Sequence, residues 1–128
     1  MTRWLATIAV LSHAGIAWFH GAAHKQLGVG LNTCQTWFVN VVITAAPLVA
    51  MILVWTRLAR WGYLLFALSM AGALAFGIYH HYIAVSSDHV AHLPPGDATM
   101  FQATAALLVL AEAASVAIGV YGYRKSRP

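Results

Sequence analysis

Histidine is the side chain with the most potential for chemistry in this sequence. Six of the seven histidines fall into three close groups, which are His20 with His24, His80 with His81, and His89 with His92. Neutral imidazole is a favoured ligand of zinc, copper and iron, and residues four apart on a helix project their side chains the same way. We therefore predict a metal site that draws on these groups, with zinc or copper as the bound ion.

The three groups offer different ligand geometries. On a helix, His80 and His81 point about 100° apart, so at most one of them joins a given site. His89 and His92 form a close pair on a loop, where Asp88 is a further ligand or an acceptor for an imidazole N–H. Cys34, the one cysteine, allows no disulfide within the chain and is a weaker candidate ligand.

A second polar pair is expected deeper in the protein. His13 lies seven residues before His20, on nearly the same helix stripe, and Glu112 lies inside the last apolar run. At 1.5 Å per residue, both side chains fall roughly 16 to 21 Å from the helix ends nearest the histidine groups. A buried carboxyl must keep its proton or find a partner, so we predict a His13–Glu112 hydrogen bond or proton relay. The alternative is a protonated Glu112 bonded to Ser115, Asn40 or a backbone carbonyl.

Long apolar runs must position these residues. The chain has 128 residues, of which 61% are hydrophobic and 8% charged, whereas soluble domains carry roughly one quarter charged residues. Runs of about 20 apolar residues cross a bilayer as helices. We expect four such spans, at about residues 4–24, 34–55, 61–83 and 98–123. The predicted fold is a single all-α domain, residues 1–128, built as a four-helix transmembrane bundle.

Local features of the first two spans add detail to this pattern. The basic start and apolar run of the first segment also fit a signal peptide. Because this run is long enough to span and carries His13 and His20, we expect it to be retained. Asn32 and Thr33 predict a helix cap before the second span. Pro47 inside that span predicts a kink or a locally loosened helix.

Positive charge is concentrated on one side of the predicted bundle. The residues on that side are Arg3, Arg57, Arg60, Arg124, Lys125 and Arg127, against Lys25 on the other. Basic residues mark the cytoplasmic side of a membrane protein, so both termini should be cytoplasmic. The histidine groups then lie on the non-cytoplasmic side of a bacterial-type inner membrane or a plasma membrane.

Three functions are compatible with these residues. The first is a metal-binding membrane protein that handles the ion or uses it in catalysis; catalysis would need an open position for a metal-bound water. The second is a haem b electron carrier, with or without quinone as its redox partner. Its axial ligands would come from the first and third spans, such as His20 and His80. The third is a small transporter that couples protons to metal movement and uses His13 and Glu112 as an intramembrane relay.

The expected partners follow from the same features. They are the lipid bilayer, a metal ion, and either a second copy of the chain or another membrane subunit, because small residues such as Gly72, Gly77 and Gly119 allow close helix contact. The net charge of +4 does not indicate nucleic acid, since Lys and Arg gather at span ends and form no basic face. These elements identify no particular protein family.

Overall fold

Four long helical segments make up the computed structural model, which describes residues 1–126 and contains no strand in that range. The first segment is α1 (Thr2–Leu27), and the fourth is α5 (Thr99–Lys125). The second consists of α2 (Thr33–Phe38), the π-helix η1 (Val39–Ala45) and α3 (Ala46–Leu53). The third consists of α4 (Ala59–Ile78) and the π-helix η2 (Tyr79–Ile83). Each segment is long and apolar enough to cross a membrane. The sequence prediction of an all-α chain with four such helices is therefore confirmed, with ends that differ by a few residues.

The second segment is interrupted in the way its sequence predicts. Asn32 caps α2, because its side chain accepts from the Gln35 N–H at 2.9 Å while the Gln35 side chain accepts from the Asn32 N–H at 2.8 Å. The π-helical segment η1 ends directly before Ala46 and Pro47, the first two residues of α3. Proline has no N–H and its ring clashes with the carbonyl four residues earlier, so a widened turn at this point relieves the helix.

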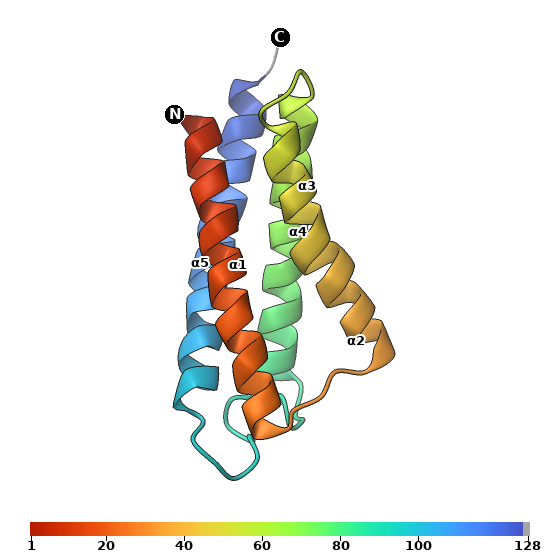
Figure 1. Cartoon of the computed structure of the whole chain (residues 1–128), viewed down its shortest axis with the longest axis vertical. Coiled ribbons are helices and arrows are strands. Elements are labelled where there is room, and N and C mark those ends of the chain that lie inside the picture. The colour runs from red at the N-terminus through yellow and green to blue at the C-terminus, as the bar shows by residue number, and fades with distance from the viewer. Residues whose placement is uncertain (127–128) are drawn as a thin grey trace.

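The two ends of the bundle differ in chemistry (Figure 1). The start of α1, the end of α5 and the α3–α4 connection lie at one end, which we call the basic end. Its basic residues are Arg3, Arg57, Arg60, Arg124 and Lys125; Arg127 lies outside the described residues. The α1–α2 and α4–α5 connections lie at the opposite end, which we call the histidine end.

Small residues bring the helices into contact toward the basic end. Gly119 of α5 lies directly on Ala67 of α4, and Gly122 lies on the ring of Tyr63. A core of buried residues fills this half of the bundle, namely Ala6, Val10, Ala50, Val54, Tyr63, Phe66 and Met70. This half is therefore closed by apolar packing.

The histidine end is more open. The segment of α2 and η1 slants away from α1 in Figure 1, so the two helices separate toward this end. Phe101 of α5 is fully buried here and packs with Ala23 and Leu27 of α1 and Val29 after it. The splayed segment leaves space between α1, η1, α4 and α5, and the buried histidines border that space.

The contact between α4 and α5 gives a first testable expectation. A β-carbon on Gly119 would lie 2.9 Å from both Cα and Cβ of Ala67, too close to be accommodated without moving the helices apart. Gly119→Val should therefore lower the free energy of unfolding by about 1–3 kcal/mol, measured by denaturant titration in detergent micelles. Gly15→Val is the matched control, because a β-carbon there meets nothing within 4 Å. Equal losses in both variants would show that helix propensity, and not this contact, sets the stability.

Candidate metal centre

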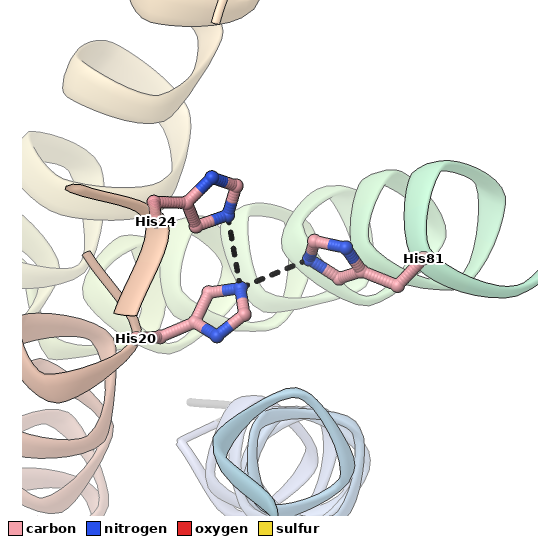
Figure 2. Close-up of side chains that lie close together, drawn as sticks. All are labelled: His20, His24 and His81. Atoms are coloured by element: carbon pink, nitrogen blue, oxygen red, sulfur yellow. Dashed lines mark hydrogen bonds between the residues drawn. The ribbon is translucent and has the colours of Figure 1, made fainter. Parts of the chain in front are cut away.

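Three of the predicted histidines converge at the histidine end. His20 and His24 project from α1 and His81 projects from η2, and Figure 2 shows the three rings turned toward one point. The Nε2 atom of His20 lies 3.1 Å from Nε2 of His81 and 3.2 Å from Nε2 of His24. One ring nitrogen from each residue lies within 4.8 Å of the other two, so this histidine triad can hold a metal ion.

The other ring nitrogen of each histidine has its own oxygen partner. His24 Nδ1 lies 3.1 Å from the carbonyl oxygen of Val29, and His81 Nδ1 lies 3.0 Å from the carbonyl oxygen of Asp88. His20 Nδ1 lies 2.9 Å from the hydroxyl of Thr104. That hydroxyl donates its own hydrogen to the carbonyl of Met100 at 2.6 Å. All three oxygens must therefore accept a hydrogen bond from the imidazole.

These partners indicate the tautomer of each ring when it is neutral. A neutral imidazole carries one N–H, and the hydrogen bond that this N–H makes decides which nitrogen is left with a lone pair. If Nδ1–H donates in all three neutral rings, each Nε2 is the nitrogen with the lone pair. The three Nε2 atoms would then turn their lone pairs toward one another, an arrangement that a bound cation satisfies.

Local backbone structure supplies two of these oxygens. Gly28 ends α1 in the left-handed conformation, with φ 66°, so that the Val29 N–H donates back to the carbonyl of His24 at 3.0 Å. The same turn brings the Val29 carbonyl to the His24 ring. The loop after η2 folds back in a similar way, because the Val90 N–H donates to the His81 carbonyl at 3.0 Å and holds Asp88 beneath that ring.

A carboxylate adjoins the triad. Asp88 Oδ1 lies 3.5 Å from Nε2 of His24 and 3.3 Å from Nδ1 of His81. Asp88 is 6% exposed, and within residues 1–126 neither of its carboxylate oxygens has a hydrogen-bond partner. Burial raises the pKa of Asp88, but its contacts with His81, and to a smaller extent with His24 and His20, lower it more, so the net pKa lies below its ordinary value. Asp88 is therefore an acidic group that adjoins the triad.

The remaining predicted ligands lie apart from the triad. His80 Nδ1 is 3.3 Å from the Gln35 side-chain amide, and its ring packs on Phe76. His89 and His92 contact each other, with their Nδ1 atoms 3.1 Å apart, on the loop after η2. The structure thus brings together His20, His24 and His81. It also places the His20 Nε2 atom against His81, so the geometry does not favour His20 and His80 as a pair of haem ligands.

The second predicted pair is in contact. His13 Nε2 lies 3.1 Å from Glu112 Oε1, and both residues are 3% exposed. The other carboxyl oxygen, Oε2, has no hydrogen-bond partner among the described residues. Ser115, one of the alternative partners, instead donates to the carbonyl of Ala111 at 2.7 Å.

One cavity joins the two polar sites. It has a volume of about 410 Å³ and is bordered by the triad and Asp88 at one end and by Glu112 at the other. Between them the lining is largely apolar, with Val39, Ile43, Phe76, Leu108 and Val109 among its residues. Two of the three acidic side chains in the whole chain therefore border the same cavity.

Sequence reasoning missed the groups that orient the triad. Thr104 carried a signal, since it lies eight residues before Glu112 on the same helix and therefore on nearly the same face. The carbonyls of Val29 and Asp88 carried none, because backbone oxygens have no side-chain signature. Asp88 was expected beside His89 and His92, whereas its carboxylate faces His81 and His24.

Comparisons of the chain with protein-family profiles, with curated protein sequences and with solved structures find no match. The geometry of the site is therefore the basis for assigning a function.

The His13–Glu112 pair generates a stability prediction. Glu112→Met keeps the length of the side chain but removes both oxygens, leaving the buried His13 Nε2 without its partner. We expect a loss of about 1–3 kcal/mol in the free energy of unfolding, measured by denaturant titration in micelles. Glu112→Gln, which retains a hydrogen-bonding group, should lose less. The double variant His13→Leu/Glu112→Met should show non-additive losses, and simple additivity of the two single losses would mean that the pair is not coupled.

Proposed function

We propose that this chain is an integral membrane protein that binds one transition-metal ion through His20, His24 and His81, in order to hold or hand over the metal. The observation that carries the proposal is the convergence of three Nε2 atoms, each on a ring whose Nδ1 faces an oxygen. A single proton does not satisfy this arrangement, because a proton on His20 Nε2 can point along only one of its two contacts. A metal ion accepts all three lone pairs at once.

The spacing of the nitrogens supports a tetrahedral ion. Zinc binds imidazole nitrogen at about 2.0–2.1 Å, and tetrahedral angles then separate two nitrogens by roughly 3.3 Å. The separations of 3.1 and 3.2 Å from His20 to its two neighbours are close to this value. Histidines that bind metals also donate their other N–H to a carbonyl, carboxylate or other oxygen, as all three do here.

Three imidazoles form the donor set in this proposal, and Asp88 lies beside it. Asp88 Oδ1 lies 3.3 Å from His81 Nδ1, the ring nitrogen turned away from the shared point, and 3.5 Å from His24 Nε2, so it would balance the charge of a bound ion without being a ligand. Imidazole ligands suit zinc better than copper(I), which prefers softer sulfur ligands. Three protein ligands leave the fourth position of a tetrahedral zinc ion open, through which the ion could be handed over.

The membrane setting is supported by the surface of the bundle. Large apolar side chains such as Trp18, Trp37, Leu110 and Ile52 are exposed over the helices, which is costly in water and favourable in lipid. The basic residues gather at the end opposite to the triad. With basic residues on the cytoplasmic side, the metal centre would lie at the non-cytoplasmic surface.

Metal analysis of the purified protein tests this function. Protein extracted from the membrane fraction and measured by elemental mass spectrometry should contain close to one zinc ion per chain. His20→Ala, His24→Ala and His81→Ala should each lower the zinc content at least tenfold, because each removes one ligand from a set of three. A chain found outside the membrane fraction would contradict the proposed insertion in the membrane. A red preparation with a haem absorption band would contradict zinc as the bound group and indicate haem.

The control for this experiment uses histidines that lie outside the triad. His80→Ala and the double variant His89→Ala/His92→Ala remove the same chemical group without touching the three converging nitrogens. Both should retain the zinc content of the unaltered chain. Loss of zinc in these variants, with retention in His20→Ala, would move the site away from the triad. If the chain contains one copper ion in place of zinc, the triad remains the metal site and only the identity of the ion changes.

The hydroxyl of Thr104 provides a finer prediction. Thr104→Val has the same shape but lacks the oxygen that receives the His20 N–H. We expect the zinc affinity to fall about 10- to 100-fold, measured by competition with a chromogenic chelator. Thr7→Val is the matched control, since it removes the hydroxyl that accepts from Trp55 Nε1 near the basic end of α1. Equal affinity of Thr104→Val and the unaltered chain would mean that this hydroxyl does not orient His20.

A further inference from the structure

The cavity beneath the triad is larger than a metal ion needs. An ion held by the three Nε2 atoms occupies one end of a space of about 410 Å³, and pockets that bind small molecules measure about 300–1,000 Å³. The space arises because η1 slants away from α1 and because Gly21 and Gly77 present no side chain to it. A β-carbon on Gly21 would meet no atom within 4 Å.

Glu112 supplies a specific polar contact at the far end of this cavity. Its Oε1 atom is bonded to His13, and its Oε2 atom is buried with no partner in the described part of the chain. When Glu112 is ionised or shares its proton with His13, Oε2 is an acceptor with free lone pairs. Buried acceptors are almost always hydrogen-bonded. A molecule in the cavity that donates a hydrogen bond would therefore satisfy Oε2.

The path between the two polar ends is unobstructed at Gly77. A β-carbon on Gly77 would lie 3.8 Å from Glu112 Oε2 and 4.0 Å from Cδ2 of His81. These are ordinary contact distances, so the missing side chain leaves room between the carboxyl and the metal centre. A ligand lying there would contact both.

The lining decides the class of ligand. Apolar side chains from η1, α4 and α5 surround the middle of the cavity, and Lys25 borders it on α1. Lys25 and Asp88, which have opposite charges, both border the cavity, so Lys25 opposes a cation, Asp88 opposes an anion, and any charged group is costly to bury in a membrane protein. A neutral molecule with an apolar ring and a hydroxyl group avoids these costs, and its hydroxyl can donate to Oε2.

We infer that this cavity binds a membrane-soluble phenol or similar hydroxylated ring compound, whose hydroxyl hydrogen bonds to Glu112 Oε2. We place the entrance of the cavity between α1 and η1, because these elements diverge there and Ala17, Gly21, Val39 and Ile43 from the two of them border the cavity. In a bilayer this entrance faces lipid, where such molecules dissolve. The inference uses the same cavity as the proposed metal site but does not require the ion.

A pair of probes tests the hydroxyl contact. 1-Naphthol and 1-methoxynaphthalene share a ring system, but the ether has no donor for Oε2. Their dissociation constants are measured from saturable increases in the unfolding temperature of the purified full chain. We expect 1-naphthol to bind at least tenfold more tightly, and we expect Glu112→Met to remove this preference. Equal binding of both probes to the unaltered chain, or binding of neither, would overturn the inference.

A second variant keeps the test decisive if Glu112→Met does not fold. Gly77→Leu fills the cavity between Glu112 and His81 and should weaken binding of both probes at least tenfold. Gly15→Leu makes the same change on the exposed side of α1, outside the cavity, and should bind both probes normally. Undiminished 1-naphthol binding by Gly77→Leu would place the ligand elsewhere and overturn the inference.

Zinc content measured on the same samples separates this inference from the proposed function. One zinc per chain without a preference for 1-naphthol would overturn the ligand site alone. A clear preference for 1-naphthol in a chain that binds no metal would overturn the metal site alone and support the ligand site.

Discussion

The constraint on which the histidine end depends is that three imidazoles, two of them buried and one partly buried, face one another through their Nε2 atoms. If all three rings are neutral with Nδ1–H as donor, their lone pairs repel unless a cation lies between them, and apolar surroundings screen that repulsion poorly. Each ring is held in this state from behind, by the carbonyls of Val29 and Asp88 and by the hydroxyl of Thr104. Two loops and one helix thus each place an oxygen against a ring of the triad. Such orientation of all three rings is typical of a binding site.

The bundle meets two opposite demands along its length. Toward the basic end, Gly119 and Gly122 let α5 lie directly on α4, and a continuous apolar core closes the interior. Toward the histidine end, the π-helical turn before Pro47 accompanies a segment that diverges from α1 and leaves the cavity open. Because the closed half fixes the helices relative to one another, the open half can hold polar groups without collapsing around them.

The sequence predicts the helices well and the site only in part. Long apolar runs specify four helices, and the four-residue spacing of His20 and His24 specifies that they act together. Choosing His81 over His80 depends on the rotation of η2 relative to α1, which no local pattern records. His89 and His92 have an equally suggestive spacing but contact each other on the loop. The carbonyl partners come from the paths of two loops, so they follow from tertiary structure and not from residue type.

Charge balance connects the two polar sites into one unit. The chain has only three carboxyl groups, and Asp88 and Glu112 both border the cavity that contains the triad. Buried carboxylates are costly unless a positive charge or hydrogen bonds compensate them. Asp88 Oδ1 lies 3.3 Å from His81 Nδ1 and 3.5 Å from His24 Nε2, so positive charge on the triad, such as a bound cation, would compensate it. His13 performs that role for one oxygen of Glu112 and leaves the other facing the cavity. In the proposed site, Asp88 would balance the charge of the ion on the triad, and Glu112 Oε2 would remain available to a ligand in the cavity.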